Sequence, residues 1–184
     1  MNLRRLGSSA VFAVLMLTAS ATGACQDDPV ASAAAAVTGG VTDPLRFVKA
    51  AYRLDGQSPD RPAPPEMLDQ DKPEYSPRLR ALFAIQQREH GKDEVGRLDM
   101  DIFTGTQDGE LKDIRVVSAE VEYAVPPRRI VTATFTNMGR PTTMHFYFER
   151  MGAKWFLDDI ATPGNGKPDD MPAWTLSLIL KYGW

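Results

Sequence analysis

Residues 128–160 read RRIVTATFTNMGRPTTMHFYFERMGAKWFLDDI, and apolar side chains recur at every second position in three runs of this stretch. The three runs consist of Val131, Ala133 and Phe135; of Met144, Phe146 and Phe148; and of Trp155 and Leu157. A period of two places alternate side chains on opposite faces of a β-strand. The stretch therefore predicts three strands, each with one apolar face.

Short breaks separate these runs and set the direction of the strands. Residues 137–140 and 151–153 are short enough for hairpins, and Pro126-Pro127-Arg128 divides the first run from an earlier one. In the earlier run four residues share one strand face, namely Val117, Ala119, Val121 and Tyr123. Short connections make successive strands antiparallel neighbours. We expect an antiparallel meander.

Helices are predicted on both sides of the meander. Asp43-Pro44 and Ser76-Pro77 each combine a capping residue with a proline at the first helical position, and these two helices reach Gly56 and Gly91. A last amphipathic helix is predicted from about Pro172 to Tyr182. The fold class that follows is α+β, with N-terminal helices packed on one face of the sheet and a C-terminal helix.

The start of the chain has the order of an export signal. Arg4 and Arg5 precede an apolar run at 10–17, and small residues fill 18–24. The apolar run is too short to span a bilayer, which takes roughly 20 residues. We therefore interpret residues 1–24 as a signal peptide that is removed after export.

Cys25 is the only cysteine and follows Thr22-Gly23-Ala24, which resembles the lipobox cut by the lipoprotein signal peptidase. Acylation would leave this cysteine without a free thiol, which suits an oxidising compartment. The sequence thus predicts a lipoprotein at the periplasmic face of a membrane, and Gln26 favours the outer membrane. Ordinary cleavage after Ala21 or Ala24, giving a soluble periplasmic protein, is the alternative.

The mature chain divides into a tether and one domain. Residues 25–42 carry the cysteine and a low-complexity stretch without large side chains, so they bury little surface. Residues 43–184 are one domain, and 43% apolar residues in the chain suffice for a core without disulfides or metals. The net charge is -3 for the full chain, and removal of residues 1–24 with Arg4 and Arg5 makes it -3 - 2 = -5, so we expect no electrostatic attraction of the chain as a whole to nucleic acid or anionic lipid.

Two strings of residues within the domain resemble a known family. They are 98–103 (LDMDIF), followed by Gln107-Asp108 and Leu111-Lys112-Asp113, and 154–160 (KWFLDDI). Over residues 43–184 the chain resembles an uncharacterised family, a domain of unknown function in small secreted proteins and lipoproteins of Gram-negative bacteria. Ile102 stands where the family has proline.

The resemblance implies a cone-like fold. The family is similar to nuclear transport factor two and to the cystatin-like and SnoaL-like proteins, in which helices close a curved antiparallel sheet over a pocket. It implies no catalytic residue and no cofactor.

Acidic residues supply the candidates for chemistry. Counted from Asp99, the spacing of Asp99, Asp101 and Glu110 partly matches a calcium loop, but Phe103 and Thr104 occupy the fifth and sixth positions. Capping and turn hydrogen bonds explain these acids better, so we predict no metal. His90 and His145 are too few for zinc without cysteine partners.

Asp159 is the candidate pocket acid. It is predicted on the same strand face as Trp155 and Leu157, where burial would shift its pKa. Alternatively, it lies beyond the buried stretch and is solvated.

Three functions follow. The first is a non-enzymatic binding module on a lipid tether, which binds a small ligand or a periplasmic protein through a pocket or the sheet face. The second is an immunity or inhibitor protein against a periplasmic hydrolase. The third is a small SnoaL-like enzyme with Asp159 as base.

Overall fold

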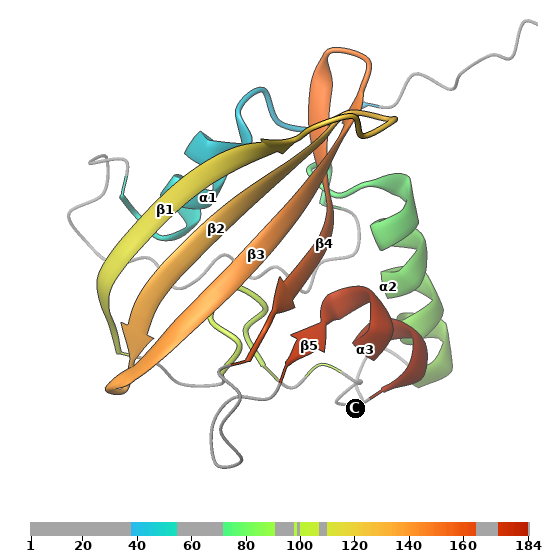
Figure 1. Cartoon of the computed structure of the whole chain (residues 1–184). Coiled ribbons are helices and arrows are strands. Elements are labelled where there is room, and N and C mark those ends of the chain that lie inside the picture. Colours follow the sequence, from blue (N-terminus) through green and yellow to red (C-terminus); the bar gives the residue numbers. More distant parts are fainter. Residues whose placement is uncertain are drawn as a thin grey trace, which may run out of the picture. The chain divides into compact units, whose positions relative to one another are not determined.

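A computed structural model describes residues 38–54, 72–90, 98, 100–106, 110–164 and 173–183. Within these ranges the chain forms one five-stranded antiparallel sheet in the order β1-β2-β3-β4-β5, together with three helices (Figure 1). The strands are β1 (Leu111–Val121), β2 (Arg128–Asn137), β3 (Arg140–Met151), β4 (Lys154–Thr162) and β5 (Trp174–Thr175). The helices are α1 (Pro44–Ala51), α2 (Pro77–His90) and α3 (Leu176–Tyr182).

The central hairpins confirm the predicted meander. Asn137 pairs with Arg140 across the β2–β3 turn, and Met151 pairs with Lys154 across the β3–β4 turn. Gly139 and Gly152 take positive φ angles of 78° and 60° in these turns, a conformation that glycine adopts without steric cost. Short turns of this kind leave each strand beside its predecessor.

The predicted core face is confirmed on the two central strands. Val131, Ala133, Phe135, Met144, Phe146 and Phe148 are all buried. Tyr52 at the end of α1 lies against the rings of Phe103, Phe135 and Phe146, at centroid distances of 6.3, 5.6 and 6.2 Å. The Tyr52 hydroxyl donates to the Phe103 carbonyl oxygen at 2.5 Å, and burial raises its pKa. Aromatic rings from the end of α1, the turn 101–106, β2 and β3 therefore meet in the core.

The predicted face of β1 is the exposed one. Val117 is 63% exposed and Tyr123 is 97% exposed, whereas Val116 is buried. A bulge between Lys112 and Arg115, with Asp113 at a φ of 56°, adds one residue on β1 and sets which residues face the core. The period of two was correct, but alternation alone does not identify the buried face.

Both predicted N-terminal caps are confirmed. Asp43 Oδ1 accepts hydrogen bonds from the amides of Leu45 and Arg46 at 2.9 and 3.3 Å, and the Ser76 hydroxyl oxygen accepts from the Leu79 amide at 3.0 Å. A side-chain oxygen at this position satisfies amides that the helix leaves without an acceptor.

The predicted C-terminal helix begins later than expected. Trp174 and Thr175 are not helical, because they pair with Thr162 and Ala161 as β5. The helix α3 therefore starts at Leu176.

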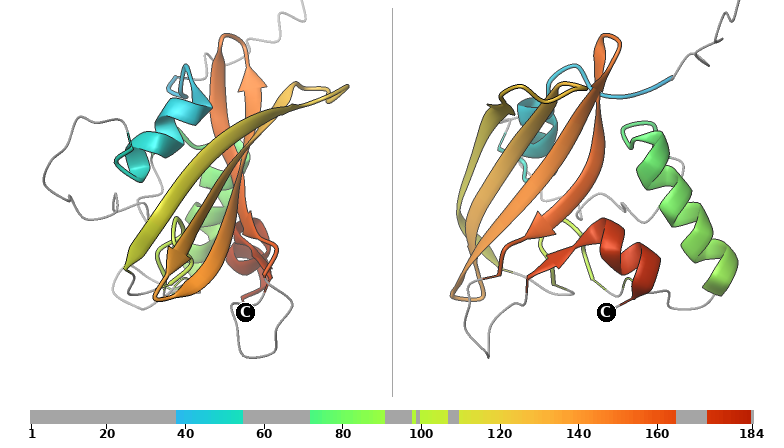
Figure 2. Two further views of the ribbon diagram at one scale, coloured as in Figure 1. Left: turned by 60° about the vertical axis from the view of Figure 1, so that its left-hand side comes forward. Right: turned by 45° about the vertical axis from the view of Figure 1, so that its right-hand side comes forward.

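The predicted fold class, in which N-terminal helices pack on a curved sheet in a cystatin-like or SnoaL-like cone, is wrong. The structure is mostly the sheet with three short helices, and its N-terminal helices form no layer over it (Figure 2). The helix α2 packs against α3 and β4, at one side of the sheet. The helix α1 contacts β1 and β2 and contributes Val48 and, at its end, Tyr52 to the core, where the buried turn residues Ile102 and Phe103 join them.

Three short segments cover the outer edge of β4. Val41 exchanges backbone hydrogen bonds with Trp155 at 2.7 and 2.9 Å, and Leu157 is bonded to Glu74 and Ser76 at 2.8 Å each. The strand β5 covers the last part of this edge. The final residues of the predicted tether are thus bound to the domain.

Packing also accounts for the glycine that precedes Val41. A Cβ atom at Gly40, which has a φ of +74°, would lie 2.7 Å from the ring of the buried Phe156. Only glycine permits this close approach without displacing the ring.

Candidate binding surface

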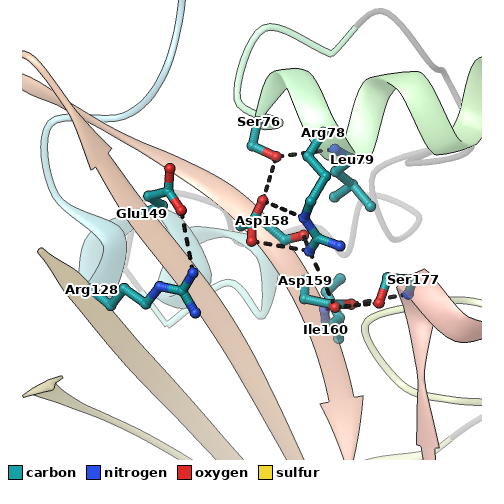
Figure 3. Close-up of polar contacts among 9 residues, drawn as sticks. All are labelled: Ser76, Arg78, Leu79, Arg128, Glu149, Asp158, Asp159, Ile160 and Ser177. Carbon is teal, nitrogen blue, oxygen red and sulfur yellow. Dashed lines mark hydrogen bonds and ion pairs between the residues drawn. The ribbon is translucent and has the colours of Figure 1, made fainter. Parts of the chain in front are cut away.

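The candidate acid Asp159 lies in a polar cluster between β4, α2 and α3 (Figure 3). The Ser177 hydroxyl donates to its Oδ2 at 2.5 Å, and the Ser177 and Ile160 amides donate to its Oδ1 at 3.0 and 2.9 Å. Arg78 Nη2 lies 3.3 Å from Oδ2. Each carboxylate oxygen of Asp159 therefore has at least two donors.

The preceding residue, Asp158, binds the start of α2. Its carboxylate accepts from the Ser76 hydroxyl at 2.6 Å and from Arg78 Nε and Nη2 at 3.0 Å each. The hydrogen bond to Asp158 raises the pKa of Arg78. Together the two aspartates join the first residues of α2 and α3 to β4.

Asp159 does not share the face of Leu157. Tyr147 pairs with Asp159 while the next residue, Phe148, pairs with Leu157, so β4 has one extra residue at Asp158. This bulge reverses the alternation, because paired residues point to the same side of a sheet. Asp159 thus lies on the face of the half-buried Tyr147, away from the core. Composition and period carry no signal for such a bulge.

Two of the three metal candidates, Asp101 and Glu110, are described, and they lie in different surroundings. Asp101 accepts from the Phe103 amide at 2.6 Å within the turn 101–106, and burial raises its pKa. Glu110 is exposed and pairs with Lys112 at 3.0 Å. Among the residues that the structure describes, no three acidic, histidine or cysteine side chains gather in a way that would hold a metal ion.

Two of the predicted functional residues, Cys25 and Asp99, lie outside the described residues. Among the helices that are described, none is long and apolar enough to cross a membrane. The export and lipidation signals remain predictions from the sequence.

The face of the sheet opposite the core is the largest candidate surface. Pairing across β1, β2 and β3 aligns its side chains in three rows: Val117, Thr132 and His145; Ala119, Ile130 and Tyr147; and Arg115, Thr134 and Thr143. Figure 1 looks onto this face, and no described helix lies in front of these strands. We call these nine residues the open face.

The open face mixes apolar and hydrogen-bonding groups. Val117, Ala119 and Thr134 are exposed, and Ile130, Thr132 and Tyr147 are half-buried by their neighbours. Thr132 Oγ1 lies 3.0 Å from His145 Nδ1, and burial lowers the pKa of His145. Near pH 7 this face therefore carries its positive charge chiefly on Arg115.

The sequence contains a signal for this surface in the apolar row of β1, because alternation marks the row without assigning it to the core or to solvent. Val117, Ala119 and Val121 alternate with Ser118 and Glu120, and both sets are exposed in the structure. An exposed apolar row of this kind is a candidate contact surface.

The chain matches none of the family models, curated proteins or solved structures with which it was compared. Its resemblance to the uncharacterised secreted family accordingly stays a prediction.

Proposed function

We propose that this protein is a non-enzymatic, exported binding module, tethered to a membrane through lipidated Cys25, that binds a protein partner with the open face. The observation that carries the proposal is the uncovered apolar row of β1, in which Val117 is 63% exposed. Exposed apolar rows flanked by polar groups are typical of protein-binding surfaces.

The arrangement around Asp159 supports binding over catalysis. A general base needs a lone pair directed at a substrate proton, and its carboxylate accepts from Ser177, the Ile160 amide and Arg78. The same bonds hold two helices to β4, which is a structural role. They disfavour a small enzyme that uses this acid as its base.

The shape of the open face favours a macromolecular partner. Small ligands bind mainly in concave pockets, whereas the three rows of the open face are the side chains of a sheet surface. An immunity or inhibitor protein that docks on a periplasmic hydrolase is the specific form of this proposal. It requires the partner to present a complementary polar and apolar surface.

Photo-crosslinking in cells tests the open face. A photoreactive amino acid placed at Val117 or Thr134 in the full chain is expected to give a discrete covalent adduct of larger mass. The control position is Leu178 in α3, which is 55% exposed and lies away from the open face. Equal adduct patterns at Val117 and Leu178, or none at Val117 and Thr134, would contradict the proposal.

Fatty-acid labelling tests the tether. Cells that express the full chain are expected to incorporate labelled fatty acid into the protein, and Cys25→Ser is expected to abolish the label. Labelling that survives this substitution would exclude Cys25 as the anchor.

A further inference from the structure

The end of the sheet that holds the β1–β2 and β3–β4 turns is also where residues 38–42 join the domain. The Arg150 amide donates to the Pro127 carbonyl oxygen at 3.0 Å, which links the two turns. Lys154 Nζ donates to Thr42 Oγ1 at 2.8 Å, next to the pairing of Val41 with Trp155. Figures 1 and 2 show both turns at this end and α3 at the other. We call this region the turn end.

The turn end exposes large apolar side chains. Tyr123 and Val125, in the β1–β2 turn, are 97% and 95% exposed, which makes them the most exposed of the large hydrophobic residues described. They contribute nothing to the core. The two residues are separated only by Ala124, and large apolar groups exposed together are candidates for a contact outside the domain.

Basic side chains lie at the same end of the sheet. Arg128, Arg150 and Lys154 are exposed at the same end. The acids of this region are Asp43, Glu120, Glu122 and Glu149. Glu120 pairs with Arg129, and Glu149 lies 3.6 Å from Arg128. Arg150 and Lys154 have no such ion pair among the described residues, so their charges are not offset by a bound acid.

With the proposed lipid anchor at Cys25, the chain would hold this end near a membrane. Cys25 precedes Thr38 by thirteen residues, and thirteen residues span at most about 45 Å when fully extended. Because Val41 is bound at Trp155, the anchor chain enters the domain at the turn end. The β1–β2 turn is therefore among the parts of the domain that the tether holds close to the bilayer.

We propose that the turn end docks on an anionic bilayer, with Tyr123 and Val125 in the interface and Arg128, Arg150 and Lys154 against lipid phosphates. This inference rests on the proposed lipid anchor. Tyrosine is favoured at the membrane interface, and each basic residue near an anionic surface stabilises binding. Acids elsewhere on the domain oppose this weakly, because charges are screened beyond about 8 Å at physiological salt.

Docking at the turn end would give the tethered domain a fixed orientation. The strands would then point away from the bilayer. The open face would not lie against the membrane and would stay accessible to a partner. The proposed lipid anchor is one membrane-binding contact, and the turn end would be a second contact that also sets the orientation of the domain.

Site-specific quenching tests the docking on the lipidated full chain. Because acylation removes the thiol of Cys25, Val125→Cys introduces a single thiol for an environment-sensitive fluorophore. In vesicles of phosphatidylethanolamine and phosphatidylglycerol that contain a nitroxide-labelled lipid, fluorescence at position 125 is expected to be quenched strongly. The matched control, Leu178→Cys, is expected to show little quenching. Equal quenching at both positions, or none at 125, would overturn the inference.

Fatty-acid uptake is measured on the same samples, so that a failure of the proposed lipid anchor can be distinguished from a failure of the proposed docking. Uptake at Cys25 without quenching at 125 overturns the docking alone. No uptake overturns the anchor and, with it, the docking that rests on it.

Charge variants test the electrostatic part. In the labelled Val125→Cys protein, Lys154→Gln is expected to lower the ratio of docked to undocked protein about fivefold. Lys181→Gln, at the far end of the domain, is expected to change nothing. Unchanged quenching in the Lys154 variant, and equal quenching in vesicles of phosphatidylcholine alone, would exclude the contacts with anionic lipid.

Discussion

The two outer long strands of the sheet, β4 and β1, differ in how far the rest of the chain covers them. In β4, Trp155, Phe156 and Leu157 are buried in succession, and three segments from elsewhere in the chain cover its outer edge. In β1, both the apolar row and the alternate residues are exposed beyond Val116, and β1 is the end of the strand order.

This difference distinguishes the surface that stabilises the fold from the surface that is left for binding. Uncovered edge strands are prone to pair with other chains, and proteins usually cover or charge them. Here the cover is concentrated on β4, where it joins α2, α3 and the N-terminal segment to the sheet. Stability should therefore depend on β4 and binding on β1.

The largest expected contrast is between a buried and an exposed aliphatic residue on these two strands. Leu157→Ala removes a fully buried side chain and is expected to lower the free energy of unfolding by about 2–5 kcal/mol. Val117→Ala is expected to change it by less than about 0.5 kcal/mol. Chemical denaturation measures both, and similar losses would show that β1 is buried against something.

Gly40→Ala tests the segment that covers β4. The added methyl group would collide with the Phe156 ring, and overpacking of this kind costs about 1–3 kcal/mol. Gly139→Ala is the control, since it shares a positive φ but would meet no atom within 4 Å. If thermal denaturation shows equal losses, the penalty comes from the backbone conformation and the segment does not seal the edge.

The two helix caps give a smaller contrast. Ser76→Ala removes the α2 cap and its bond to Asp158, and is expected to cost about 1–2 kcal/mol. Asp43→Ala removes the exposed α1 cap, and a cost of about 0.5–1 kcal/mol is expected. Urea titrations should show a larger loss in the free energy of unfolding for Ser76→Ala than for Asp43→Ala. The reverse order would mean that the α1 cap, on the β1 side, contributes more to stability than the α2 cap.

The smallest effect concerns the open face. Burial holds the pKa of His145 below its ordinary value of 6.5, so the unfolded chain binds a proton more readily than the folded one. Stability should fall as the pH drops from 6.5 through the lowered pKa of the folded state. His145→Gln should remove this part of the pH dependence, as measured by denaturation midpoints between pH 7 and pH 5. An unchanged profile would mean that His145 is fully solvated.

The sequence by itself determined the local structure of this domain. Proline after a capping residue located the starts of α1 and α2, and the period of two located the strands, because both signals depend on contacts within a few residues. The faces of β2 and β3 followed as well, since the alternate residues of these strands are largely apolar on one side and polar on the other.

Only the tertiary structure decided what packs on what. The bulges at Asp113 and Asp158 set which residues of β1 and β4 face the core, and they removed Asp159 from the face of Leu157. The placement of α2 beside α3, the cover of β4 by Gly40 and Tyr75, and the exposure of Val117 all depend on contacts between distant segments. Periodicity shows that a strand or helix has an apolar face. It holds no information about which distant segment covers that face, or whether any segment does.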